Sequence, residues 1–223
     1  MKKLATIFLL VFMAPASWAD DKDPEELPDP AKMIEEQAKA ILEILRENRD
    51  DLAQDPDRLY QLVEDKMLPV FDVPYSTRLI MGRHGRDASR EQRQAFGEAL
   101  YKFLVRNYAD GILEYTDEEV EVQPVRGTPD PDRQRVRTKL IRPGASDIPV
   151  DYSVRWTDEG WKIFDVTVEG VSYVTNYRSS FDREIREKGL DAVIERLERR
   201  AERKEEELEE TLEENADESE DEE

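Results

Sequence analysis

The chain has 223 residues, 39 % of them charged, with a formal net charge of −21 and no cysteine. A chain this acidic is not expected to bind DNA, RNA or anionic membrane surfaces unaided. Without disulfides, an exported domain must be stabilised by its own core, and roughly 200 residues are enough to form one.

Residues 1–19 are predicted to be a cleavable secretory signal peptide rather than part of the fold. Two lysines precede an apolar run from Leu4 to Met13, and Ser17-Trp18-Ala19 places small residues before a cleavage site at Asp20. The run is much shorter than the roughly 20 residues of a membrane span. The sequence therefore predicts a soluble exported protein in a bacterial periplasm.

Most of the negative charge lies at the two ends of the mature chain. Residues 20–29 hold six acidic residues, one basic residue and two prolines, which predicts a disordered acidic leader. Residues 202–223 hold fourteen acidic and two basic residues, which predicts a solvated tail that is partly helical or disordered. One domain is expected between them, at 30–201.

The first half of this domain is predicted to be helical. An amphipathic helix is expected over 30–52, a second over 57–68 that Pro69 ends, and a short third over 74–81. The segment GRHGRD that follows is expected to be a loop. Ser89 and Gln92 form a capping-box pair, which predicts the start of a long helix there.

After Thr116 the apolar period changes from 3.6 to 2, which indicates strands. Four are expected, joined by short antiparallel connections: one around 120–122, then 134–142, 148–156 and 161–168. From Ser172 the pattern is helical again, and Gly189 is expected to separate two helices. The fold class is therefore α+β, with a helical layer on a four-stranded antiparallel sheet.

The sequence contains no recognisable catalytic motif. A Ser-His-Asp triad would depend on His84, the only histidine, which is expected to be exposed in its loop. There is no G-x-S-x-G elbow and no glycine-rich phosphate loop, and the lack of cysteine leaves few zinc ligands. Acidic pairs are common, but nothing marks one out. We expect no enzyme, no metal and no cofactor, while a hydrolase of acyl substrates that uses His84 stays open.

The stretch VEGVSYVTNYRSSF, at 168–181, combines a turn with apolar helical spacing. Gly170 is expected to turn the chain sharply off the fourth strand. Val168, Val171, Val174, Tyr177 and Phe181 then recur every three or four residues, which is the spacing of a helix face. Such a face belongs either to an ordinary core or to the wall of a cavity.

Four segments carry a family resemblance: LPVFDVPYSTRLIMGRH (68–84), ASREQRQAF (88–96), IPVDYSVRW (148–156) and GWKIFDVTVEGVSYVTNYRSSF (160–181). They resemble the MlaC family of periplasmic phospholipid-binding proteins, also called toluene-tolerance auxiliary proteins. The resemblance covers about 30–200. Two departures are Gly85, where the family often has an aromatic residue, and an acidic extension beyond Ala201 that is longer than expected.

The resemblance implies a carrier and not an enzyme. It implies a curved sheet folded against helices, with an apolar lipid pocket between them that encloses acyl chains. It further implies transfer of phospholipid between an outer-membrane lipoprotein–porin complex and an inner-membrane ABC transporter with an MCE-domain protein, which maintains outer-membrane lipid asymmetry. A monomer is expected.

On this resemblance we expect particular side chains to contact the lipid. The expected pocket residues are Phe71, Leu79, Leu104, Tyr108, Tyr152, Val154, Val166, Val168, Val171, Val174 and Tyr177. Arg83, Arg86 and Arg178 are weaker candidates for the head group: a solvated loop explains Arg83 and Arg86 better, and a surface ion pair explains Arg178 equally well. Two other functions stay open: an exported binding or chaperone module that holds a partner helix, and a carrier of another lipid such as a hopanoid.

Overall fold

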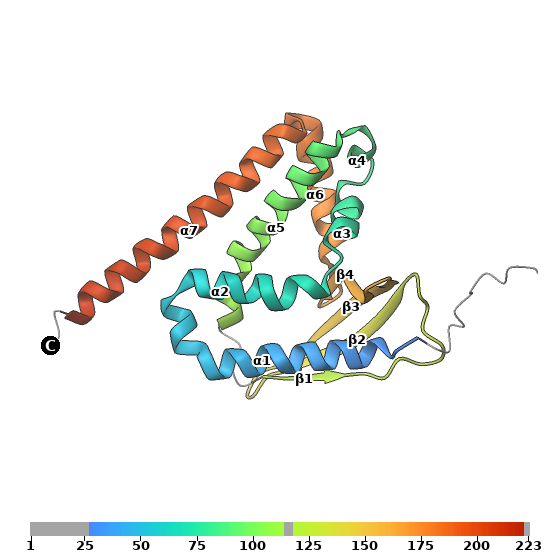
Figure 1. The fold of residues 1–223 in the computed structure, drawn as a ribbon, viewed down its shortest axis with the longest axis horizontal. Helices are drawn as coiled ribbons and strands as arrows, with labels where there is room; N and C mark the ends of the chain where they lie inside the picture. The colour runs from blue at the N-terminus through green and yellow to red at the C-terminus, as the bar shows by residue number, and fades with distance from the viewer. Residues whose placement is uncertain (1–26, 114–117, 221–223) are drawn as a thin grey trace, which may run out of the picture.

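The computed structural model describes residues 27–113 and 118–220 and shows an α+β fold, as predicted (Figure 1). The predicted signal peptide, most of the leader and the last three residues lie outside the described residues. The elements follow one another as α1 (Pro30–Gln54), α2 (Pro56–Leu62), a π-helical turn (Val63–Met67), a 3-10 turn (Leu68–Val70), α3 (Val73–Met81), α4 (His84–Asp87), α5 (Arg90–Leu113), β1 (Glu119–Val122), β2 (Gln134–Ile141), β3 (Ile148–Thr157), β4 (Gly160–Val168), β5 (Val171–Ser172), α6 (Tyr173–Lys188) and α7 (Leu190–Glu220).

Polar side chains fix the starts of the main helices where the sequence indicates. The Asp29 carboxylate accepts the N–H of Ala31 at 2.9 Å, with Pro30 in the first turn of α1. The capping box before α5 is confirmed: the Ser89 N–H donates to the Gln92 side chain at 3.0 Å, and the Gln92 N–H donates to Ser89 Oγ at 3.1 Å.

Two predicted segments differ from the structure. The helix expected over 57–68 is α-helical only to Leu62 and continues as a π turn and a 3-10 turn, because Pro69 lacks an N–H and crowds the preceding turn. The segment GRHGRD is not a loop: residues His84–Asp87 form the single helical turn α4, which the bond from the Ala88 N–H to the His84 carbonyl closes at 3.0 Å.

The sheet contains the four predicted strands and one more. Its order is β1-β2-β3-β4-β5, and all neighbours are antiparallel. The additional strand β5 has two residues and pairs with the end of β4 through a two-residue turn. Glu169 and Gly170 both have positive φ, at 50° and 83°, as the tight turns of hairpins require. Gly170 therefore turns the chain as expected.

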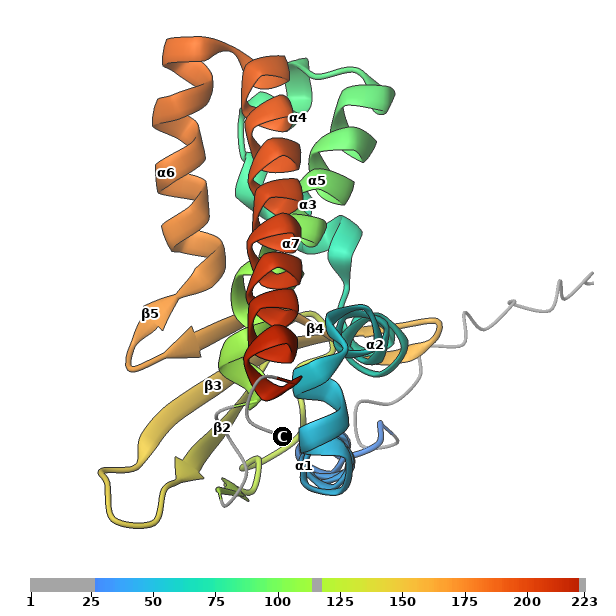
Figure 2. The same ribbon diagram turned by 90° about the vertical axis from the view of Figure 1, so that its left-hand side faces the viewer.

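The helices pack into a bundle that stands on the sheet. Figure 2 shows α5, α6 and α7 rising together, with α1 beside the strands. The bundle core includes Phe96, Val193 and Leu197, all fully buried. A second core joins α1 to the sheet through Ile34, Val154 and Ile163. Within the described residues, no helix is long and apolar enough to cross a membrane.

Candidate functional site

One face of the sheet gathers apolar side chains from β2, β3, β4 and β5. Residues paired across antiparallel strands point to the same side, so the register places several expected pocket residues together. We call this surface the apolar face, and its members are Val136, Val150, Tyr152, Val154, Ile163, Val166, Val168 and Val171. Five of the eleven expected pocket residues belong to it: Tyr152, Val154, Val166, Val168 and Val171.

The apolar face passes from fully covered to open. At one end α1 covers it, and Val154 is completely buried against Ala31 and Ile34. Towards the β4–β5 turn the cover ends: Val168 is half-buried and Val171 is 56 % exposed. Burial also raises the pKa of the Tyr152 hydroxyl, so this side chain stays neutral in the apolar surroundings.

A cluster of three tyrosines continues from the open end of the apolar face. Tyr173 opens α6 directly after β5, and its ring lies 5.9 Å from Tyr108 on α5 and 6.2 Å from Tyr177. The hydroxyls of Tyr108 and Tyr177 lie 3.0 Å apart, and Tyr108 is 42 % exposed. Burial, followed by the hydrogen bond with Tyr108, raises the pKa of Tyr177. Leu104, one turn before Tyr108, packs on the bundle core.

A pocket of about 660 Å³ lies between α3, α6 and β4, on the other side of β4. Phe164 and Asp165 project into it, whereas Ile163 and Val166 belong to the apolar face. Its apolar wall includes the expected residues Leu79 and Val174. Four arginines also line it, and we call it the arginine pocket: Arg83, Arg133, Arg178 and Arg186. Of the three expected head-group residues, Arg83 and Arg178 thus line this pocket and Arg86 does not.

Both carboxylates of the arginine pocket have partners. The buried Asp165 accepts hydrogen bonds from Ser172 Oγ at 2.6 Å and from the Val174 N–H at 3.0 Å, at the start of α6. Asp182 lies 2.8 Å from Arg83 and 3.1 Å from Arg186. Partial burial raises the pKa of the Asp182 carboxyl, but the hydrogen bond to His84 and the two arginines outweigh it and hold this pKa below its ordinary value.

His84 is not the exposed loop residue that was expected. Its side chain is only 16 % exposed, and its Nε2 lies 2.9 Å from Asp182 Oδ1. The α4 turn causes this, because it directs the imidazole toward α6 rather than into solvent. In the described part of the chain the hydrogen-bond partner of His84 is a carboxylate and not a serine hydroxyl, so the arrangement is not a nucleophile–base pair.

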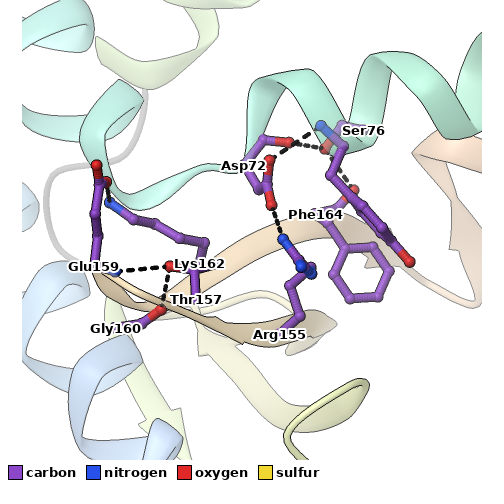
Figure 3. A network of polar contacts seen from close by, with 9 residues as sticks. Asp72, Ser76, Arg155, Thr157, Glu159, Gly160, Lys162 and Phe164 are labelled. Carbon is purple, nitrogen blue, oxygen red and sulfur yellow. Dashed lines mark hydrogen bonds and ion pairs between the residues drawn. The ribbon is translucent and has the colours of Figure 1, made fainter.

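Phe71 packs against the core under the apolar face and forms an isolated bridge with Ile163, and it also lines a second pocket of about 480 Å³ near the β3–β4 turn. Figure 3 shows the polar network there. The Asp72 carboxylate accepts from Arg155 at 2.5 Å and from the Tyr75 N–H at 3.0 Å, while Ser76 Oγ donates to the Phe164 carbonyl at 2.8 Å. These bonds anchor the start of α3 to β3 and β4, so the network holds the fold together.

Several residues of the site are not predicted from the sequence. Arg133, Arg186 and Asp182 lie in segments with many charges, where nothing distinguishes them. Asp165 did carry a signal: it is an acid within the apolar run of β4, and such a group needs hydrogen-bond donors when buried. The described residues contain no group of three or more His, Cys, Asp or Glu side chains that could hold a metal ion.

Comparison with known proteins gives consistent matches. The family model described as "MlaC protein" matches residues 35–199. The intermembrane phospholipid transport system binding protein MlaC of Haemophilus influenzae is 20 % identical over 173 residues, which are 76 % of this chain and 81 % of that protein. The toluene tolerance protein ttg2D of Pseudomonas putida is 25 % identical over 163 residues, 73 % of this chain and 75 % of that protein.

A solved structure shares the fold. It is that of a phospholipid-binding protein from Ralstonia solanacearum in complex with a phospholipid. It matches with a TM-score of 0.74 at 24 % identity and covers 79 % of this chain and 99 % of that chain.

Proposed function

The chain belongs to the MlaC family, and we propose that it is a soluble periplasmic phospholipid carrier. It encloses acyl chains and moves lipid between an outer-membrane lipoprotein–porin complex and an inner-membrane ABC transporter with an MCE-domain protein. Its role is then to maintain outer-membrane lipid asymmetry. The relatives named for phospholipid transport support this proposal.

The proposal rests on the positions of the large apolar side chains that are exposed to solvent in the described chain. There are two exposed ones, Tyr108 and Val171. Val171 lies at the open end of the apolar face, and Tyr173, two residues further along the chain, contacts the Tyr108 ring. An apolar surface that continues from a core into solvent at one place is typical of a ligand-binding site.

The chemistry of the cargo explains why a carrier needs such a surface. Each buried methylene contributes about 0.8 kcal/mol, so two acyl chains of about thirty carbons favour an apolar site over water by roughly 20 kcal/mol or more. A free lipid therefore does not cross an aqueous compartment at a useful rate. Enclosing the chains requires shape and apolar area, and it requires no nucleophile, metal or cofactor.

Native mass spectrometry of the protein purified without detergent, followed by lipid extraction, tests the proposal. We expect about one phospholipid per chain. The extract also names the lipid, so a hopanoid would be recognised. A clean apo mass in a folded protein that also takes up no labelled lipid from vesicles would contradict the carrier, and a module that holds a partner helix would then be the better hypothesis.

Two substitutions on the apolar face should reduce lipid retention. Val168→Glu and Val171→Glu place a charge where acyl chains would lie, at a large desolvation cost. Thr167→Glu is the matched control, because Thr167 pairs with Asp151 and Ser172 on the opposite face of the same strand. Retention is expected to fall in the first two variants and to persist in the control. Equal retention in all three would remove both valines from the site.

A further inference from the structure

The arginine pocket has more positive charge than its own carboxylates balance. Asp182 is shared by Arg83 and Arg186, and Asp165 is satisfied by Ser172 and the start of α6. Arg133 and Arg178 remain. In the residues that the structure describes, neither forms an ion pair. An uncompensated pair of guanidinium groups in one pocket is unusual in a chain whose net charge is −21.

The backbone at the end of α3 accommodates one of these two arginines. Gly82 has a φ of +53°, and a Cβ atom at this position would come within 2.9 Å of Arg178 Nε and 3.3 Å of one of its terminal nitrogens. The guanidinium group therefore lies directly against the Gly82 backbone, in space that only a glycine leaves free. Arg178 is thus held at the wall of the pocket although it has no carboxylate partner.

The second arginine reaches the pocket from a different segment of the chain. Arg133 lies just before β2, and its guanidinium carbon is 5.6 Å from the centre of the Phe164 ring. This contact with an aromatic face orients the group without neutralising it. The two free guanidinium groups come from segments far apart in the sequence and line one cavity, which also contains the apolar side chains Leu79 and Val174.

We propose that the arginine pocket binds a phosphate group through Arg178 and Arg133. Guanidinium groups recognise phosphate oxygens by paired, charge-assisted hydrogen bonds. The volume of about 660 Å³ exceeds that of a phosphate alone and leaves room for the group attached to it. The phosphate has two possible sources, the head group of a phospholipid or free inorganic phosphate. The head-group source rests on the proposed carrier function, and the free-phosphate source does not.

Substitutions that each remove one positive charge test the proposal. Arg178→Gln and Arg133→Gln alter the pocket. Arg126→Gln is the matched control, because Arg126 is exposed in the loop before β2 and does not line the pocket. Gly82→Ala is a further variant that keeps every charge but displaces the Arg178 side chain. Binding is measured by calorimetry with inorganic phosphate at constant ionic strength, and by uptake of labelled phosphatidylglycerol from vesicles.

We expect both pocket variants to weaken binding by about tenfold or more and the control to leave it unchanged. A loss seen with inorganic phosphate identifies a free-anion site, and a loss seen only with phosphatidylglycerol identifies a head-group site. The proposal is overturned if neither probe responds to Arg178 or Arg133, or if Arg126→Gln weakens binding equally. Normal lipid uptake in all variants would support the carrier function and contradict the head-group site. Phosphate binding by a protein that takes up no lipid would support a free-phosphate site and contradict the carrier function.

Discussion

Tyr101, on α5, shows how a single buried hydroxyl makes stability depend on pH. Its oxygen is buried without a hydrogen-bond partner in the described part of the chain. Burial, together with the nearby Glu64 carboxylate, raises the pKa of Tyr101 to about 12, although Arg106 lowers it in part. The folded protein therefore keeps this proton at a pH where the unfolded chain, with a pKa of about 10, has lost it.

The consequence is a loss of stability in alkali. Below pH about 10 both states keep the proton and the contribution is fully present, whereas it declines as pH rises from about 10 to about 12. The variant Tyr101→Phe should lose less stability over this range than the wild type. At neutral pH it should be as stable as the wild type or more so, because the hydroxyl it removes is unbonded. Urea denaturation at about pH 9 and about pH 11 measures both effects, and parallel losses in the two proteins would refute the assignment.

Residues differ in how far the sequence alone could place them. Tyr152 and Val154 could be assigned to one face by strand alternation, but the register shift at Ser153/Val154 breaks that alternation in β4 and places Ile163 on the same face as Val166. Val174 and Tyr177, three residues apart on one helix, were expected to line the same pocket. In the structure both pack against the bundle core, but only Val174 lines the arginine pocket, whereas Tyr177 packs between Tyr108 and Phe181. Helix spacing fixes a common face, but it does not fix how neighbouring elements divide that face.

At the scale of elements, caps fix helix boundaries that the apolar pattern leaves open. The capping box of α5 joins Ser89 and Gln92 by two hydrogen bonds. Ser89→Ala removes one of them and should lower the free energy of unfolding by about 1 kcal/mol. Ser180→Ala, at an exposed position inside α6, is the control and should change stability by less than about 0.5 kcal/mol. Chemical denaturation measures both, and an equal effect would show that the Ser89 cap contributes nothing.

Some secondary-structure elements could be predicted from the sequence and others could not. Strands β2, β3 and β4 and the bounds of α1 and α3 were predictable, since each has clear periodicity and a proline, capping residue or turn at its end. The π turn after Leu62 and the two-residue β5 were not. A π turn has no distinct apolar period, and β5 exists only because Val171 and Ser172 meet the end of β4. Both depend on contacts between elements rather than on local preference.

For the whole molecule, we expect the charge of the tail to slow the approach of the chain to an anionic membrane. Residues 208–223 hold ten acidic residues and no basic one. Deleting them should speed transfer to anionic vesicles at low salt, and the gain should shrink as salt rises, because exposed charges are screened beyond about 10 Å at 0.1 M.

A variant with the ten acids replaced by glutamine separates charge from length. It should transfer as fast as the truncated protein in stopped-flow measurements. If it instead behaved like the wild type, the bulk of the tail and not its charge would slow the encounter with anionic vesicles.

The pairing of Trp156 with Trp161 gives the fold an intrinsic optical probe. The two indole rings lie 5.4 Å apart at 73°, and Trp161 Nε1 donates to the Pro28 carbonyl at 2.7 Å. The third tryptophan, Trp18, lies in the predicted signal peptide. Emission from the described chain therefore reports only the sheet and the segment that enters α1. The helices α5, α6 and α7 contain no tryptophan, so any difference between fluorescence and far-ultraviolet dichroism curves would reveal that the bundle and the sheet unfold separately.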